Sequence, residues 1–473
     1  MKKLVTGTAL ISSVNILRLI VQFVSLPLLA RLLTPEDYGI VAMAMPIVLF
    51  VMLFADSGLA SSLVREKSED MTPWHSCFWL TTGLGASFCL LLAALSPVVS
   101  YWMDEPTLSP VMAALATVIL LQSLTLIPGA ALQQEGMFGR IALAEIAGII
   151  VSLGVAIWAA LNGLGVWALV GQQIALYAVR LFFNAVLSPY RPRLVFSWGS
   201  AKGHVVFGWN VFASSVVGFG SRSAENIIIG RFRGAAELGY YGMAFQFARL
   251  PWMIVTGPLQ YVLYPLVAGA DKDLAKLRAQ ALLASKVLAI LLFAPMLLIG
   301  AASVPIFDLL LSEKWREAAY VFAMIIPAAA VQPVIGILGT FVLAIGRPDI
   351  QFKLTVHSTV LWMACLLSSV WFSLTAVAIA FTVSTLVFSL WSLRVMLPLV
   401  GCSFRDYGKA VGGQIFVGAV AVAIYAAIAL TWPMTDVESI FVAMSLAGLC
   451  VLGSFLVQWK RILGDYKAVL PAG

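Results

Sequence analysis

The chain has 473 residues, of which 61% are hydrophobic and only 11% are charged, whereas soluble domains average about 25% charged residues. A soluble protein of this length cannot bury so much apolar surface, because a single core stops growing at roughly 300 residues, so the composition predicts a membrane protein. The net charge of +7 comes without a run of Lys and Arg interleaved with aromatic residues, which argues against nucleic acid as a partner.

Fourteen mostly apolar stretches follow one another along the chain, each of the length that a transmembrane helix requires. They cover residues 8–33, 38–60, 74–100, 108–128, 141–161, 165–187, 204–230, 238–267, 279–302, 319–343, 351–372, 374–397, 410–431 and 437–459. We therefore predict an all-α integral membrane protein of about 14 transmembrane helices. The first and seventh windows are the least apolar.

The basic residues predict the orientation of these helices, because Lys and Arg are enriched in cytoplasmic loops. With a cytoplasmic N-terminus, 21 of the 29 Lys and Arg residues fall on the cytoplasmic flank and 5 on the opposite flank. The basic and then apolar start of the chain has no convincing cleavage site, so we interpret it as the first helix. Both termini are expected in the cytoplasm.

An internal repeat relates two parts of the chain. A shift of 200 residues aligns five positions in equivalent turns: Arg31 with Arg231, Asp37 with Glu237, Gly39 with Gly239, Met43 with Met243 and Ala44 with Ala244. Six helices return the chain to the same side, so the repeat is parallel. We predict an N-terminal six-helix lobe at 1–198, a second six-helix lobe at 199–398, and an additional helix pair with a cytoplasmic tail at 399–473.

The sequence carries no signature of covalent chemistry. It has no GxxxxGK[ST], HExxH or GxSxG motif, and its five cysteines are irregularly spaced. We therefore expect no catalytic residue, no metal site and no cofactor.

Charged residues within the predicted spans are the candidates for function, because a charge at membrane depth costs about 2.5–3.5 kcal/mol and usually faces a cavity or a partner. They are Arg18, Asp56, Glu145, Arg222, Glu225 and Arg249. The three arginines are candidates for binding an anionic cargo, and the three carboxylates are candidates for coupling to an ion or proton. Amide side chains in the two most polar windows extend the candidate binding set: Asn15, Gln22, Asn210 and Asn226.

Structural roles remain open for the same charges. Arg222 and Glu225 are three residues apart on one helix face and can neutralise each other. Asp56 and Glu145 lie near cytoplasmic helix ends, where water can solvate them. Arg18 and Arg249 are too deep to reach the interface easily, so they either line a cavity or belong to ion pairs that hold helices together.

Four segments resemble those of a known family. They are LLARLLTPEDYGIVAMA at 28–44, LQQEGMFGR at 132–140, GLGVWALV at 163–170 and GRFRGAAELGYYGMAFQ at 230–246. The chain resembles the lipopolysaccharide and exopolysaccharide flippases of the multidrug/oligosaccharidyl-lipid/polysaccharide exporter superfamily. The resemblance covers nearly the whole chain and is weakest after about Val400.

The resemblance implies two six-helix lobes in a V around a central cavity, with alternating access. It implies movement of an undecaprenyl-diphosphate-linked oligosaccharide from the cytoplasmic to the periplasmic leaflet of the bacterial inner membrane. The partners are then this lipid-linked cargo and membrane lipids, with a polysaccharide polymerase and co-polymerase as further candidates. Arginine in the cavity suits a diphosphate, because its planar fork donates two parallel hydrogen bonds.

Alternatives stay open at this point. A lipid II flippase or a drug or cation-coupled exporter belongs to the same superfamily. A membrane-embedded polysaccharide polymerase or ligase would act in the same pathway, but such an enzyme needs a large outward loop. The longest predicted outward loop, 303–318, has about sixteen residues.

Overall fold

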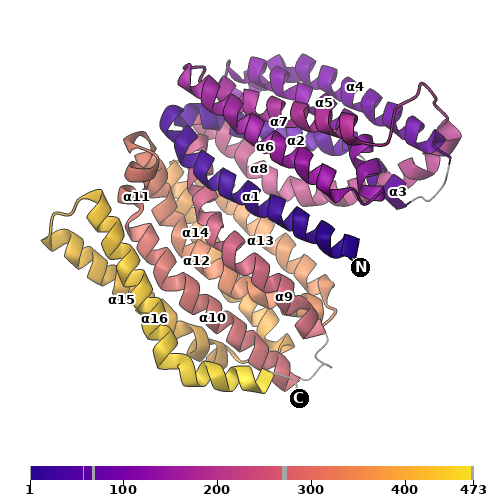
Figure 1. The fold of residues 1–473 in the computed structure, drawn as a ribbon. Coiled ribbons are helices and arrows are strands. Elements are labelled where there is room, and N and C mark those ends of the chain that lie inside the picture. Colours follow the sequence, from indigo (N-terminus) through magenta and orange to yellow (C-terminus); the bar gives the residue numbers. More distant parts are fainter. Residues whose placement is uncertain (1, 57, 66–69, 269–273, 470–473) are drawn as a thin grey trace. The chain divides into compact units, whose positions relative to one another are not determined.

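The computed structural model describes residues 2–56, 58–65, 70–268 and 274–469, and every regular element in these ranges is a helix (Figure 1). The predicted all-α fold is confirmed. The elements are α1 (Lys2–Leu32), α2 (Pro35–Asp56), α3 (Leu59–Arg65), α4 (Thr72–Met103), α5 (Leu108–Gln134), α6 (Phe138–Leu161), α7 (Val166–Leu187), α8 (Trp198–Pro251), the π-helix η1 (Trp252–Thr256), α9 (Gly257–Ala268), α10 (Leu274–Ala301), α11 (Ser303–Leu310), the 3-10 helix η2 (Glu313–Trp315), α12 (Arg316–Ala344), α13 (Pro348–Ser369), α14 (Leu374–Leu399), α15 (Phe404–Thr431) and α16 (Asp436–Val469).

Local sequence determines where several helices begin. The hydroxyl of the residue just before the helix accepts a hydrogen bond from the backbone N–H of an acidic residue three positions later. The carboxylate of that acidic residue accepts a hydrogen bond from the backbone N–H of the hydroxyl residue in return. This reciprocal cap occurs at Thr34 and Asp37 for α2, at Ser403 and Asp406 for α15, and at Thr435 and Glu438 for α16.

Eleven helices in the described part of the chain are long and apolar enough to cross a membrane. They correspond to the second to sixth and the ninth to fourteenth predicted windows. The remaining windows, 8–33, 204–230 and 238–267, are helical but are not among the eleven, and two of them are the least apolar windows of the sequence. The multi-span fold is therefore confirmed, and the count of fourteen stays a prediction.

The chain divides into two compact units, Met1–Gly239 and Tyr240–Gly473. The division falls inside α8, which is interrupted at Gly234 by a non-helical backbone with φ 82° and ψ 176°. Only glycine adopts such a conformation without steric cost. The predicted division into lobes at 198 and 398 stays a prediction.

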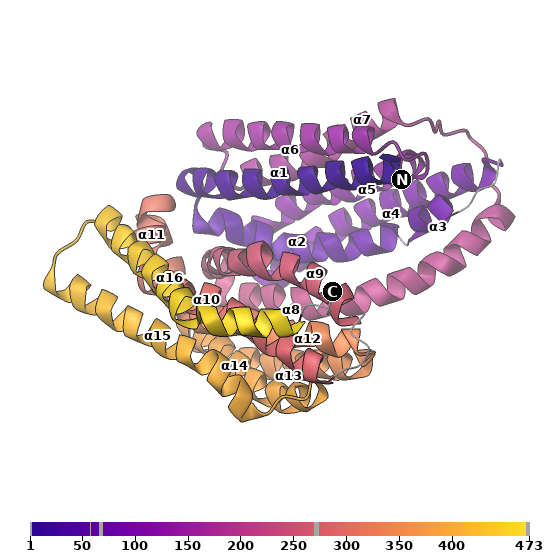
Figure 2. The same cartoon turned by 60° about the horizontal axis from the view of Figure 1, so that its bottom comes forward.

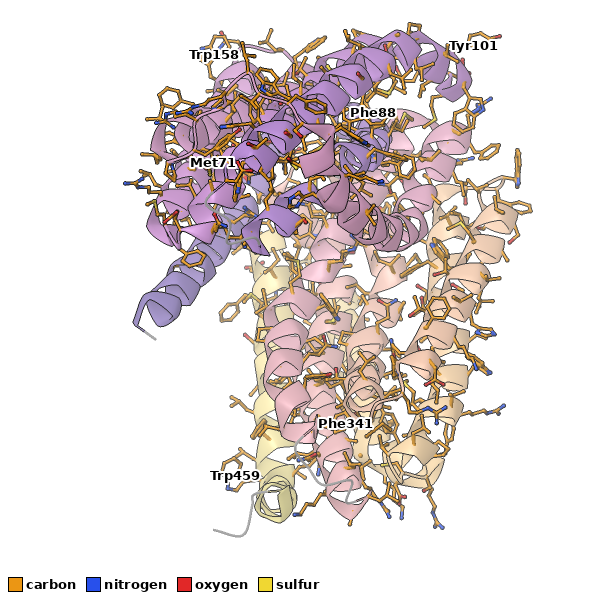
Figure 3. The ribbon with its side chains drawn as sticks, turned by 90° about the vertical axis from the view of Figure 1, so that its right-hand side faces the viewer. Met71, Phe88, Tyr101, Trp158, Phe341 and Trp459 are labelled. Atoms are coloured by element: carbon orange, nitrogen blue, oxygen red, sulfur yellow. The ribbon has the colours of Figure 1, made fainter. Side chains whose placement is uncertain are left out.

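In the first unit, α5 packs against α2, α3, α4 and α7, while α6 pairs with α7 and also contacts α1. The long α4 runs antiparallel to α5 (Figure 2). Side chains at the far ends of these helices point outward, as Tyr101 on α4 and Trp158 on α6 show (Figure 3). Such exposed aromatic residues are typical of a membrane interface.

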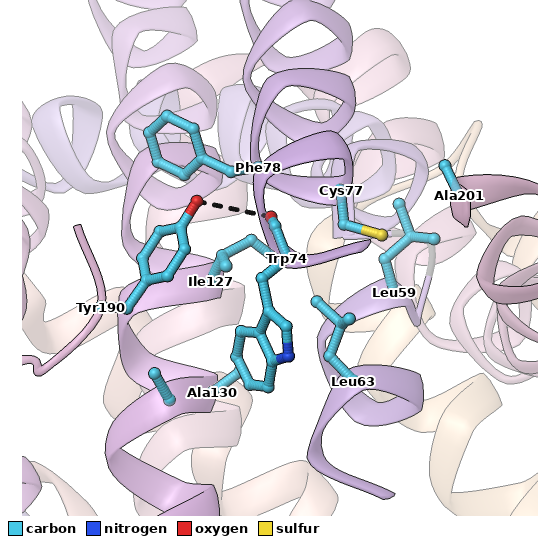
Figure 4. Close-up of a cluster of buried hydrophobic side chains, with 10 residues drawn as sticks. Leu59, Leu63, Trp74, Cys77, Phe78, Ile127, Ala130, Tyr190 and Ala201 are labelled. Carbon is cyan, nitrogen blue, oxygen red and sulfur yellow. Dashed lines mark hydrogen bonds between the residues drawn. The ribbon is translucent and has the colours of Figure 1, made fainter. Parts of the chain in front are cut away.

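The loop after α7 is fastened to the start of α4. Tyr190 is buried in a hydrophobic cluster with Trp74, and its hydroxyl donates a hydrogen bond to the Trp74 carbonyl oxygen at 3.4 Å (Figure 4). The Trp79 indole donates to the carbonyl oxygen of Arg193 at 2.7 Å. The loop that directly follows α7 is thus packed into the first unit.

This cluster gives a stability prediction. Trp74 is 2% exposed and Trp102, on the same helix, is 54% exposed. Replacing Trp74 by alanine is expected to lower the free energy of unfolding by about 3–5 kcal/mol, because a buried aromatic leaves a cavity. Trp102→Ala is the matched control and should change it by less than about 0.5 kcal/mol. Denaturation of the purified protein in detergent measures both, and equal effects would contradict the buried cluster.

In the second unit, α10 and α12 pack together, with α14 on α12 and with α15 and α16 on α10. Phe341 of α12 is fully buried, and Trp459 lies near the end of the last predicted span (Figure 3). α15 and α16 form a hairpin in which the hydroxyls of Tyr425 and Ser439 share a hydrogen bond of 2.5 Å. The predicted trailing helix pair therefore packs against the helices before it.

Candidate functional site

A cluster of three charged side chains joins α1, α6 and α7 inside the first unit. Glu145 on α6 accepts hydrogen bonds from Arg18 on α1 at 2.5 Å and from Arg180 on α7 at 2.6 Å, both through its Oε2 atom. The side chains of Arg18, Glu145 and Arg180 are 47%, 25% and 16% exposed. One carboxylate between two guanidinium groups leaves the cluster with a net positive charge.

The most buried arginine of the cluster belongs to a polar stripe on α7. Gln173, Tyr177, Arg180 and Asn184 are spaced by three or four residues, so they share one helix face. The Arg180 guanidinium carbon lies 5.4 Å from the centroid of the Tyr177 ring. Arg180 Nε and Asn184 Oδ1 are buried and have no hydrogen-bond partner among the described residues. Buried polar groups normally have a partner, so this face has the capacity to bind a polar ligand.

The structure pairs two residues that sequence reasoning kept apart. Arg18 was a candidate for cargo binding and Glu145 for ion coupling, yet they form one ion pair. Arg180 was missed because it was counted with the cytoplasmic flank of its window. Its position in the predicted window 165–187 could have identified it, because Arg180 lies seven residues, or about two helical turns, before the end of that window.

The other candidate residues are placed less closely. Arg249 is exposed near the end of α8, with its guanidinium carbon 6.0 Å from the Phe245 ring centroid. Glu225 and Asn226 are half-buried on α8. The side chains of the remaining candidates lie outside the described set: Asn15, Gln22, Asp56, Asn210 and Arg222.

A second feature of the first unit is a close backbone contact between α2 and the segment of α8 that follows Gly234. A Cβ atom added at Gly39 would overlap the carbonyl oxygen of Ala235, and one added at Gly239 would overlap that of Pro35. The shift of 200 residues aligns Gly39 with Gly239 and Pro35 with Ala235. The two contacts are therefore equivalent under the repeat, and each needs a glycine for the backbones to approach.

Carboxylate side chains occupy equivalent positions in the two turns beside this glycine contact, at Asp37 and Glu237. Asp37 caps α2 through Thr34, and a Cβ atom at Gly165 would lie 2.9 Å from the Asp37 carboxylate. In the equivalent turn, Arg233 binds Glu237 through two hydrogen bonds of 2.6 and 2.7 Å.

The same region brings together separate segments of the sequence. Leu29 of α1 and Leu33, which directly follows α1, share a hydrophobic cluster with Ala168 and Leu169 of α7. Three of the four family-like segments, 28–44, 163–170 and 230–246, thus meet at one place.

Comparison with known proteins identifies the family. A family model described as polysaccharide biosynthesis protein matches residues 28–320. The succinoglycan biosynthesis transport protein ExoT of Rhizobium meliloti (strain 1021) is 28% identical over 298 residues, which cover 63% of this chain and 60% of ExoT. The lipopolysaccharide biosynthesis protein WzxC of Escherichia coli (strain K12) is 24% identical over 414 residues, which cover 86% of this chain and 83% of WzxC.

Solved structures of transporters share the fold. The lipid II flippase MurJ in an inward closed conformation superimposes with a TM-score of 0.74 at 12% identity, covering 95% of this chain and 99% of MurJ. An inward-facing multidrug resistance MATE family transporter of the MOP superfamily gives a TM-score of 0.57 at 15% identity, covering 81% of this chain and 96% of that one. Because the family model spans more than half of the sequence, from Leu28 to Tyr320, the chain belongs to the family of polysaccharide biosynthesis proteins.

Proposed function

We propose that this protein moves an undecaprenyl-diphosphate-linked oligosaccharide repeat unit from the cytoplasmic to the periplasmic leaflet of the bacterial inner membrane. The named relatives are biosynthesis and transport proteins for bacterial polysaccharides, which supports a cargo of this class. The flippase acts by alternating access and performs no covalent chemistry. The observation that carries the proposal is the net positive cluster of Arg18, Glu145 and Arg180 on α1, α6 and α7, of which α6 and α7 are long and apolar enough to cross a membrane.

The cluster can exchange one anion for another. Without cargo, Glu145 binds both guanidinium groups and offsets part of the cost of burying that of Arg180. A diphosphate brings more acceptor oxygens and more negative charge than one carboxylate, so it competes for both arginines. Glu145 is then released and is able to take up a proton or a cation for the return step. Arg222 and Arg249 extend the cargo path in this proposal, with Asn15, Gln22, Asn210 and Asn226 as further hydrogen-bonding groups and with Asp56 and Glu225 as additional coupling groups.

A flipping assay tests the function directly. The purified protein is reconstituted into vesicles with a fluorescent undecaprenyl-diphosphate oligosaccharide in both leaflets, and a membrane-impermeant reagent that quenches the outer fluorophores follows movement between leaflets. We expect protein-dependent exposure of the inner pool. Movement of lipid II but not of the oligosaccharide would overturn the cargo assignment and leave the transporter class intact.

A membrane enzyme of the same pathway is disfavoured by the segment between α10 and α12. The longest predicted outward loop of the chain, 303–318, contains α11 and η2 in the structure, and α11 packs on α12 and α16. Arg316 binds Asp308 at 2.6 Å across this segment. A compact segment of this size offers little surface for acceptor sugars. Sugar transfer to a lipid-linked acceptor by the purified protein would overturn the proposed function.

The proposed orientation has its own test. The distribution of basic residues places both termini and the segments after Arg193 and Lys409 in the cytoplasm, with the segment after Arg316 in the periplasm. Alkaline phosphatase fused after Arg316 is expected to be active, and the same reporter after Arg193 or Lys409 inactive. A fluorescent protein that folds only in the cytoplasm should give the reverse pattern. A reversed result at one of these positions would mean that the number of membrane spans predicted before that position is wrong.

A further inference from the structure

The second unit carries cationic and aromatic side chains that the proposed cargo cluster does not use. α13 and α14 form an antiparallel pair joined by residues 370–373. The His357 ring on α13 packs against the Trp391 ring on α14, with ring centroids 4.9 Å apart and planes at 45°. This contact fixes which turns of the two helices lie at the same level.

Two exposed cationic side chains lie at one end of the ring pair. Lys353 lies one turn before His357 on the same face of α13, and the Lys353 carbonyl oxygen lies 2.6 Å from His357 Nδ1. Arg394 follows Trp391 by three residues on α14, which is again about one turn. Because the helices are antiparallel, Lys353 and Arg394 extend from the same end of the ring pair, and all four side chains are exposed.

The cations of this group have no carboxylate partner in the described part of the chain. The sequences of α13 and α14 contain one carboxylate, Asp349, and Arg347 binds it through two hydrogen bonds of 3.0 Å. Other arginines of the second unit do pair with carboxylates, as Arg278 does with Asp406. Both helices are candidate membrane spans, where an uncompensated charge is costly. A counter-ion from outside the described chain would remove this cost.

We propose that Lys353, His357, Trp391 and Arg394 form a binding site for the phosphate group of a lipid with an anionic headgroup. Basic residues at the ends of membrane helices attract anionic headgroups. Arg394 supplies the fork that suits phosphate oxygens, and Lys353 adds a mobile point charge. The Trp391 ring, with one apolar and one polar edge, suits the boundary between headgroup and hydrocarbon. The phosphate belongs to a bilayer phospholipid or to a lipid-linked cargo, and both sources share this chemistry.

Binding to defined lipids tests the site. The full-length protein in detergent is titrated with short-chain phosphatidylglycerol, whose phosphate is its only charge, and with short-chain phosphatidylcholine, which carries no net charge. Replacing both Lys353 and Arg394 by glutamine is expected to weaken phosphatidylglycerol binding by about tenfold or more, because two charge-assisted hydrogen bonds are lost. The control replaces Arg405 and Lys409, two exposed basic residues of α15, by glutamine and should bind as the wild type does.

Further measurements separate the outcomes. The variant Lys353→Arg keeps the charge and should bind phosphatidylglycerol nearly as tightly as the wild type, which tests the site even if the double variant is unstable. Reduced phosphatidylglycerol binding with normal movement of lipid-linked oligosaccharide would support a resident phospholipid, and parallel loss of both would support the cargo. Equal wild-type affinity for the two lipids, or unchanged affinity in the double variant, would overturn the proposal whether or not the protein is a flippase.

Discussion

Valine in place of Gly39 or Gly239 is expected to lower oligosaccharide transport by roughly tenfold or more. Either side chain would overlap a backbone carbonyl oxygen, of Ala235 or of Pro35, so α2 and α8 have to move apart. Forcing extra atoms into a packed contact costs about 1–3 kcal/mol, and each 1.4 kcal/mol changes the population of the described state by about tenfold. A transporter that alternates between states depends on the free energy of each one.

The same two positions predict a specific pattern of coupling. Once the first substitution has moved α2 and α8 apart, the second substitution adds a smaller free-energy cost. The double variant should therefore be less impaired than the sum of the two single effects. Gly242→Ala is the control, because a Cβ atom at Gly242 meets no atom within 4 Å. Vesicle transport and thermal melting measure both properties. Wild-type transport by both valine variants would show that the glycine contact plays no part in the transport cycle.

Lysine in place of Arg18 or Arg180 is expected to reduce transport by about tenfold or more while the melting temperature changes little. Lysine keeps the ion pair with Glu145 but loses the fork that binds two phosphate oxygens at once. A charge-assisted hydrogen bond is worth about 1.5–3 kcal/mol, which sets the size of the effect. Arg140→Lys is the control on α6, because Arg140 binds a single acceptor, the Leu187 carbonyl oxygen at 2.7 Å.

Exchanging the charges separates binding from structure. In the variant with Glu145→Arg and Arg180→Glu, the ion pair between these two positions can form again, while Arg18 loses the Glu145 carboxylate that it shares with Arg180. A diphosphate site would not recover, because a carboxylate then occupies the position of a phosphate-binding guanidinium group. Transport at the wild-type level in the exchanged variant would therefore overturn the assignment of Arg180 to the cargo and leave only a role in packing.

Sequence patterns predicted most of the helices, because a membrane span must be long, apolar and internally hydrogen-bonded. They failed where the backbone departs from a simple helix. The window 238–267 was predicted as one helix, and the structure divides it into the end of α8, the π-helix η1 and α9. Pro251 stands directly before η1 and lacks the N–H that a regular helix needs. A hydropathy window does not register this loss.

The candidate site was less predictable than the fold. Periodicity identifies a charge within a span but not its partner, because 127 residues separate Arg18 from Glu145 along the chain. Only the packing of α1 on α6 brings them together. The repeat, by contrast, did point to a feature that the structure contains. Gly39 and Gly239 formed one of its five aligned pairs, and glycine at a fixed place in a turn indicates a close backbone approach.

The paired glycine contact also bears on the origin of the molecule. In a two-fold symmetric dimer, residue i of one subunit touches residue j of the other and the reverse also holds. The contacts of Gly39 with Ala235 and of Gly239 with Pro35 follow this rule. Under the shift of 200 residues, each is a contact of position 39 in one half with position 35 in the other. The glycine contact thus has the reciprocal pattern that a half-length chain would form with a second copy of itself. The two turns are no longer identical in this chain, because Thr34 caps one of them and Gly234 bends the other.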